Sequence, residues 1–321
     1  MSYLPKRHTP QVGLSLGTGS YSLAWHRSAI SVNWCTDARE LWEDEATLSP
    51  KGKNTSNSTH LDNQLTILLL PWPLKILSRD FSSQQYGDRR FFRFKPREQD
   101  KAADFLVRRK LDRIIKEAKD ETEHIDMVIL PESAVCDSTR SEMEKILRRW
   151  NVSTYITGVR VGELPDGTPT DEENPGTLGN QLCLGYTSKE NHKPRTNNGF
   201  QHVWYKKHHR WKLDSSQIKT YELGGQLAPD KDHWEDIEIR EREAVFVNLR
   251  SRLTLCPIIC EDLARQESLS ELIRAVGPSL VISLLMDGPQ RRNRWSSQYA
   301  SFFGDDPGSS VLTLTSMGMV D

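Results

Sequence analysis

Three stretches of the sequence each place a chemically active side chain at the end of an apolar run. "VILPES" ends on Pro131-Glu132, "VWYKKHHRW" carries Lys207, and "LTLCPIICEDL" carries Cys260. In α/β proteins, reactive side chains are presented at the carboxyl ends of strands. A carboxylate, an amine and a thiol that meet there could serve as base, charge stabiliser and nucleophile, so the three stretches together indicate a hydrolase site.

A second cysteine, Cys256, lies four residues before Cys260 and raises the alternative of a metal or redox pair. The segment is rich in Ile, Leu and Thr and contains Pro257, which indicates a strand. Positions four apart on a strand lie roughly 13 Å from each other, whereas a disulfide needs Cα atoms within about 7 Å. We therefore expect Cys260 to act alone, either as a buried structural thiol or as a nucleophile.

Composition excludes several other classes of protein. The chain has 321 residues and a net charge of −1, so no overall field selects nucleic acid or an anionic membrane. The apolar run at 65–77 is interrupted by Pro71 and Pro73 and is shorter than the roughly 20 residues of a membrane span. The five cysteines are odd in number without a disulfide-framework spacing, which favours a reducing cytosol.

The chain divides into two expected parts. Residues 48–60 are polar and turn-rich, so 1–60 is predicted to be an N-terminal appendage and flexible linker. In 61–321, strands alternate with helices, and uniformly apolar strands imply an α/β fold whose sheet is covered by helices. Strands are expected at 65–72, 125–133, 152–161, 180–186, 200–207, 244–249, 252–260, 279–286 and 309–319, and helices at 97–121, 138–150, 269–276 and 291–303.

The order of the three side chains resembles the nitrilase, or carbon–nitrogen hydrolase, superfamily over residues 61–321. "DMVILPES" looks like the family's strand ending in Pro-Glu, "YKKHH" matches its tyrosine-x-lysine-x-histidine pattern, and "PIICEDL" looks like its nucleophile turn. The resemblance implies a Glu132–Lys207–Cys260 triad, a four-layer αββα sandwich and a homodimer or higher oligomer. The Cys-Glu-Asp form of the turn is nearer to amidase-type members.

The resemblance also implies a reaction. Cys260 would attack a small amide or nitrile to form a thioester, with Glu132 as the base and no metal or organic cofactor. Lys207 and the backbone N–H of Glu261 would hold the developing oxyanion, and His209 would orient groups beside them. The family's second glutamate has two candidates, Gln217 and Glu222, of which Gln217 would lack the charge.

Three alternatives remain open from the sequence. A catalytically silent nitrilase-like binding module would keep the triad as a pocket; similar domains joined to bacterial anti-phage reverse transcriptases suggest a defence role by analogy. A polymerase palm is suggested by "FFGDDPG" at 302–308, where a turn is the plainer interpretation. A Cys–His hydrolase could use His208 or His209, but this would leave Glu132 unexplained.

Overall fold

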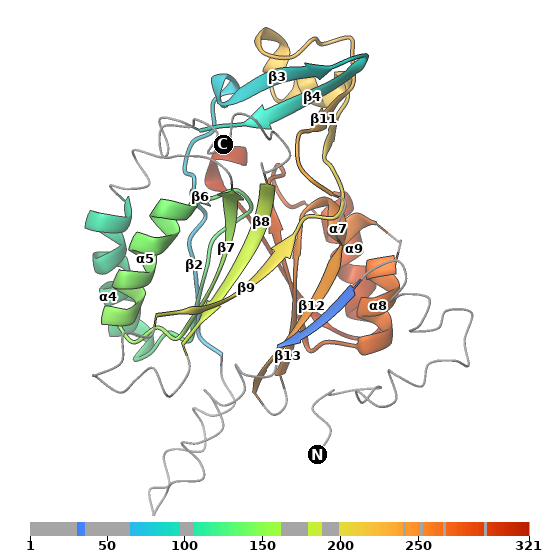
Figure 1. The fold of residues 1–321 in the computed structure, drawn as a ribbon. Coiled ribbons are helices and arrows are strands. Elements are labelled where there is room, and N and C mark those ends of the chain that lie inside the picture. The colour runs from blue at the N-terminus through green and yellow to red at the C-terminus, as the bar shows by residue number, and fades with distance from the viewer. Residues whose placement is uncertain are drawn as a thin grey trace, which may run out of the picture.

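The computed structural model describes residues 31–35, 65–96, 106–161, 179–187, 199–239, 242–250, 253–265, 268–291 and 294–320. These residues form a mixed α/β structure of several sheets and helices (Figure 1). Most of the expected appendage and linker, and the first part of the helix expected from 97, lie outside the described residues.

The first large sheet contains the strand that precedes Glu132 and the strand that precedes Lys207. Its strand order is β2-β5-β7-β8-β9, and β6 pairs with β7 off this path. β2, β5, β6 and β7 pair in parallel with one another, whereas β8 runs antiparallel to both β7 and β9. The strands are β2 (Ile67–Leu69), β5 (Met127–Ile129), β6 (Val135–Cys136), β7 (Thr154–Val161), β8 (Gly179–Tyr186) and β9 (Gln201–Lys206).

The second large sheet contains the strand that precedes Cys260. Its strands, in spatial order, are β1 (Ser31–Cys35), β12 (Glu243–Arg250), β13 (Leu253–Ile259), β14 (Leu280–Leu285) and β15 (Ser310–Thr315). β1 pairs in parallel with β12, so part of the segment expected to be an appendage adds a strand to this sheet. The division of the chain at residue 60 stays a prediction.

Alternation along the strands builds two cores. In β5, Met127 belongs to a cluster shared with the second sheet, whereas its neighbour Val128 belongs to a cluster shared with α4 and α5. In β8, Leu182 and Leu184 join the first cluster and Cys183 joins the second. Successive side chains of a strand point to opposite faces, so each strand contributes to both clusters. The first cluster contains residues of both large sheets, which therefore pack on each other through it.

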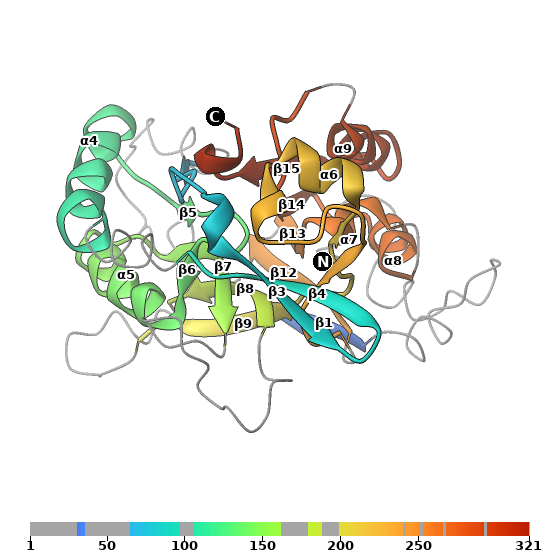
Figure 2. The same cartoon turned by 90° about the horizontal axis from the view of Figure 1, so that it is seen from above.

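Helices flank the outer sides of the two sheets. The α4 and α5 helices lie beside the first sheet, and α8 and α9 lie beside the second (Figures 1 and 2). Within the described ranges, no helix is long and apolar enough to cross a membrane. The helices are α4 (Asp112–Thr122), which continues a π-helical turn η4 (Leu106–Leu111), α5 (Asp137–Arg149), α7 (Glu261–Ala264), α8 (Ser268–Val276) and α9 (Trp295–Asp305).

A smaller third sheet, which the sequence analysis did not predict, lies over one end of the two large sheets (Figure 1). Its own core contains Phe81, Phe92, Trp211 and Ile218, so it is held by apolar packing. Its elements, in spatial order, are β10 (Lys212–Leu213), β11 (His233–Glu235), β4 (Arg89–Phe94) and β3 (Phe81–Tyr86), accompanied by α6 (Ser215–Thr220) and the short turns η3 (Ser78–Asp80), η7 (Leu223–Gly225) and η8 (Met317–Met319).

Candidate active site

Glu132 is positioned by a close backbone contact between two strands of the first sheet. The chain leaves β5 through Leu130 and Pro131, and Gly158 of β7 donates its N–H to the Pro131 carbonyl at 3.0 Å. A Cβ atom at Gly158 would lie 2.6 Å from the Glu132 Cα atom, so only glycine permits this approach. Glu132 is buried, and Ser133 after it has φ of 51°.

Lys207 follows β9 and meets two carboxylates. Its Nζ atom lies 2.7 Å from Glu132 Oε1 and 2.7 Å from Glu235 Oε2, and the residue is 1% exposed. Burial alone would lower the pKa of Lys207, but the charges of Glu132 and Glu235 raise it well above its usual value. Lys207 is therefore a fixed cation at neutral pH.

Asn180 of β8 completes the group. Its Nδ2 atom lies 2.6 Å from Glu132 Oε1 and 2.8 Å from Glu235 Oε1. Lys207 and Asn180 therefore both donate to the same pair of carboxylates, and the four side chains form a closed buried ring. Burial raises the pKa of Glu132 above its usual value, Lys207 lowers it, and Glu235 raises it.

Cys260 stands at the turn between β13 and α7. Its backbone has φ of 40° and ψ of −104°, a conformation that L side chains rarely adopt and that clusters at functional sites. Its N–H donates to the Leu284 carbonyl at 2.8 Å. Burial and the charge of Glu132 raise the pKa of Cys260 well above its usual value, against an opposing effect of Lys207, so the resting thiol is protonated.

Asp262, two residues after Cys260, joins the nucleophile turn to the segment that carries Lys207. It is fully buried and accepts bonds from the Tyr205 hydroxyl at 2.7 Å, the His209 backbone N–H at 3.0 Å and His209 Nδ1 at 2.8 Å. Burial raises the pKa of Asp262, but the bond from His209 and the neighbouring imidazoles bring it below its usual value. His209 thus lies beside the site, held by Asp262.

The structure corrects the choice of second glutamate, because neither Gln217 nor Glu222 is hydrogen-bonded to Lys207. The Gln217 side chain caps α6 by accepting the Asp214 N–H at 3.3 Å, and Glu222 is exposed on a left-handed residue with φ of 56°. Glu235 is the carboxylate that bonds Lys207 instead, at 2.7 Å. It was missed because β11 is brought to the Lys207 segment by pairing with β10 and β4 in the small sheet, which the sequence analysis did not predict.

The remaining predicted side chains have these positions. Glu261 begins α7, and its partly buried carboxylate lies 3.4 Å from Arg265. Arg210, three residues after Lys207, donates to the Glu235 carbonyl at 3.3 Å. His208 Nε2 lies 3.2 Å from the Glu243 carbonyl. Asp306 of the "GDD" stretch follows α9 and accepts from Arg274 Nε at 3.0 Å, which fits a turn better than a palm.

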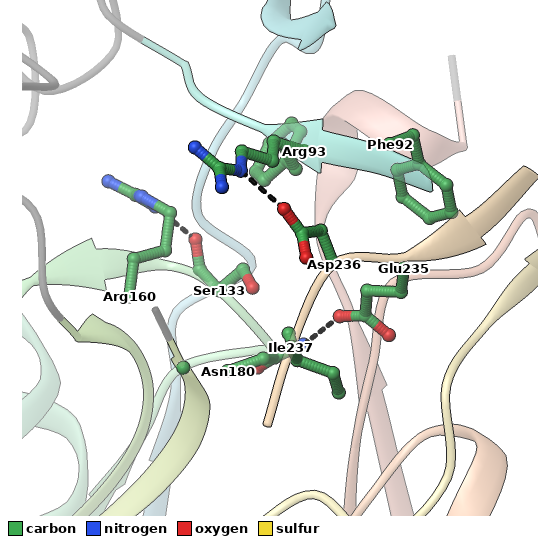
Figure 3. A pocket seen from close by; sticks show the side chains of 10 residues that line it. Phe92, Arg93, Ser133, Arg160, Asn180, Glu235, Asp236 and Ile237 are labelled. Atoms are coloured by element: carbon green, nitrogen blue, oxygen red, sulfur yellow. Dashed lines mark hydrogen bonds and ion pairs between the residues drawn. The ribbon is translucent and has the colours of Figure 1, made fainter. Parts of the chain in front are cut away.

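A pocket adjoins the buried ring between the small sheet and the ends of β7 and β8 (Figure 3). Asn180 and Glu235 face each other in its wall, whereas Lys207 and Cys260 are buried and do not line it. Both apolar and charged side chains line it: Phe92, Arg93, Phe94, Ser133, Arg160, Gly179, Asn180, Glu235, Asp236 and Ile237. A small polar molecule in this pocket would meet the carboxylate ring from the side of Asn180.

No protein-family model matches the sequence, and no curated protein matches it. Solved structures do resemble the fold. An amidase from Nesterenkonia sp. is 12% identical with a TM-score of 0.39, covering 69% of this chain and 73% of that one. Nit3 of Saccharomyces cerevisiae, of branch 10 of the nitrilase superfamily, is 13% identical with a TM-score of 0.39, covering 67% and 70%.

A carbon-nitrogen hydrolase from Helicobacter pylori G27 is 11% identical with a TM-score of 0.36, covering 70% of this chain and 66% of that one. The structures that this chain resembles therefore include nitrilase-superfamily amidases and a carbon-nitrogen hydrolase. Likeness at these identities and TM-scores carries no argument about activity.

Proposed function

We propose that this protein is an amidase-type carbon–nitrogen hydrolase that uses Cys260 as its nucleophile, Glu132 as its general base and Lys207 as its charge stabiliser. The observation that carries the proposal is the buried Lys207 ammonium, 2.7 Å from both Glu132 and Glu235. Buried charges are costly unless they are paired, and the strained Cys260 lies close enough for both Glu132 and Lys207 to act on its pKa. A purely structural cysteine needs neither a buried lysine–glutamate pair acting on its thiol nor a strained backbone.

The reaction begins with transfer of the Cys260 thiol proton to Glu132 as the sulfur attacks the carbonyl carbon of an amide. Lys207 and the Glu261 backbone N–H stabilise the oxyanion. The carbon–nitrogen bond then breaks, Glu132 gives its proton to the leaving amine, and a thioester remains. Glu132 next takes a proton from water, which attacks the thioester and releases the acid, and the proton returns to the Cys260 sulfur.

Glu235 is the second glutamate of this proposed site. It bonds Lys207 at 2.7 Å and accepts the Trp211 backbone N–H at 3.0 Å. Its charge raises the pKa of both Glu132 and Lys207. Glu235 therefore helps to keep Lys207 charged and makes Glu132 easier to protonate. Easier protonation suits Glu132, because the proposed base must both accept a proton and return it.

We further propose that the layers form the four-layer αββα sandwich. The supporting observation is the apolar cluster shared by the two large sheets, with a second cluster between the first sheet and helices α4 and α5. The expected small amide or nitrile substrate belongs to the same proposal. A homodimer or higher oligomer and a cytoplasmic location stay predictions.

Covalent labelling of Cys260 tests the nucleophile. We expect iodoacetamide to modify the parent protein at Cys260 and to leave the Cys260→Ala variant unmodified at that turn. Cys256→Ala is the matched control, because Cys256 lies on β13 just before the Cys260 turn, is fully buried in the core and has a raised pKa from burial alone. Mass mapping of the modified peptide provides the measurement.

The proposal fails if Cys260→Ala and the parent are labelled equally, or if Cys256→Ala abolishes labelling while Cys260→Ala does not. Release of ammonia from a panel of simple amides, with Glu132→Gln as the inactive comparison, then separates an enzyme from a silent binding module. An active parent with an equally active Glu132→Gln variant would remove Glu132 from the role of base.

A further inference from the structure

Asn180 makes two hydrogen bonds whose geometry only one orientation of its amide allows. It lies on β8, is 6% exposed, and places one nitrogen 2.6 Å from Glu132 Oε1 and 2.8 Å from Glu235 Oε1 (Figure 3 shows the second bond). With the amide turned over, its carbonyl oxygen would face two carboxylate oxygens at these distances and repel them. The local charges therefore fix Asn180 as a donor to both glutamates.

The bonds to Glu132 are distributed unequally between its two oxygens. Lys207 Nζ and Asn180 Nδ2 both bond Oε1, at 2.7 and 2.6 Å. Oε2 is buried and, within the described part of the chain, has no hydrogen-bond partner. Leaving a buried carboxylate oxygen without a hydrogen bond is unfavourable. A general base has a use for such an oxygen, because it must receive a proton during the reaction.

We propose that Asn180 is a positioning residue that keeps Glu132 ionised and turned so that its Oε2 atom can accept the Cys260 proton. This inference rests on the proposed function and adds a residue to its machinery. Lys207 alone would not fix the orientation of the Glu132 carboxylate, because an ammonium group donates in three directions and could follow the carboxylate as it rotates. Asn180 reaches Oε1 from a different strand, and the two donors together define the plane of the carboxylate.

Charged and titratable groups from several elements surround Glu132. Lys207 comes from the end of β9 and bonds both Glu132 and Glu235 of β11. The charge of Glu132 acts on Cys260 at the turn after β13, and Arg160 of β7 donates to the Ser133 carbonyl beside it. The bond from Asn180 lowers the pKa of Glu132, whereas burial and Glu235 raise it. Loss of the bond should therefore raise the pH at which Glu132 gains a proton.

The test compares the pH dependence of iodoacetamide labelling at Cys260 in the parent and in Asn180→Leu, which removes the donor at similar size. We expect the acidic limb of the profile to move to higher pH and labelling near neutral pH to fall about tenfold or more, because bonds to charged groups are strong. Asn180→Ser keeps a hydroxyl donor and should recover part of the loss.

The matched control is Asn248→Leu. Asn248 is also a buried amide, 5% exposed on β12, where it accepts from the Thr254 hydroxyl at 3.2 Å. Its loss should lower thermal stability without moving the labelling profile. The inference is overturned if Asn180→Leu keeps the parent profile, or if Asn248→Leu moves the profile equally.

A second measurement separates this inference from the proposed function. The infrared carbonyl band of protonated Glu132, identified by its absence in Glu132→Gln, reports the titration of Glu132 without any reaction at Cys260. We expect the band to appear at higher pH in Asn180→Leu than in the parent. Absence of parent labelling would reject the proposed nucleophile, whereas equal infrared titrations would reject the role of Asn180.

Discussion

At the scale of single residues, the site is a balance of one buried cation against two buried anions. Lys207 can neutralise only one of the two carboxylates that it contacts, Glu132 and Glu235. The excess negative charge and burial raise the pKa of Glu132, which brings a carboxyl group towards the pH at which it can both accept and donate a proton. The same excess charge raises the pKa of the Cys260 thiol.

This balance predicts opposite effects of two substitutions on the pKa of the Cys260 thiol. Glu132→Gln removes an anion that raises this pKa, so the thiolate should form at lower pH although the base that assists labelling and hydrolysis is lost. Lys207→Met removes the cation that lowers this pKa, so the thiolate should form at higher pH. The measurement is the ultraviolet absorbance of the thiolate against pH, taken as the difference from the same variant carrying Cys260→Ala.

Shifts in the same direction for both variants would contradict the arrangement of charges described here. Circular dichroism of each variant serves as the control for folding. Lys207→Met has a further consequence, since it leaves Glu132 and Glu235 facing each other without their shared partner. It should therefore also lower the stability of the protein, because two buried carboxyl groups would lose the cation that pairs with them.

At the scale of elements, the positions of the reactive groups are set by close contacts between strands. The Glu132 turn lies against β7 at Gly158, where the nearest backbone atom to an added Cβ is only 2.3 Å away. A second glycine, Gly185 of β8, makes a different close contact, with the ring of Tyr155 at 2.1 Å from an added Cβ. Both glycines allow dense packing, but only Gly158 touches the turn that carries Glu132.

Gly158→Ala is therefore expected to push the Glu132 backbone away and to reduce labelling of Cys260 as well as stability. Gly185→Ala should lower stability by a comparable amount, roughly 1–3 kcal/mol for overpacking, and leave labelling close to the parent value. Denaturant unfolding and labelling rates measure the two effects. Equal loss of labelling in both variants would show that general loosening, and not displacement of Glu132, causes the effect.

At the scale of the whole molecule, the site forms where three sheets meet. Glu132 and Lys207 follow strands of the first sheet, Cys260 follows a strand of the second, and Glu235 ends a strand of the small sheet. Asp262 bonds the turn of the second sheet to the backbone after Lys207. The geometry of the site thus depends on the packing of the two large sheets through their shared apolar cluster.

Leu184→Ala tests this dependence, because Leu184 is fully buried in the cluster between the sheets. We expect a loss of about 2–5 kcal/mol of unfolding free energy. In a Cys260→Ala background, the thiol of Cys256 in the same cluster should then become more accessible to iodoacetamide. Leu74→Ala, at a side chain that is 49% exposed, is the control and should change neither quantity appreciably.

The sequence alone predicted most strands of the two large sheets, although not β1 or β6, and the three candidate side chains that follow them. Apolar runs and helical spacing are local signals, and they predicted the strands that precede Glu132, Lys207 and Cys260. The tertiary structure decided which further groups meet them. Asn180, Glu235 and Asp262 lie far from these residues in sequence or show no local pattern, and only strand pairing and burial bring their polar atoms within hydrogen-bond distance.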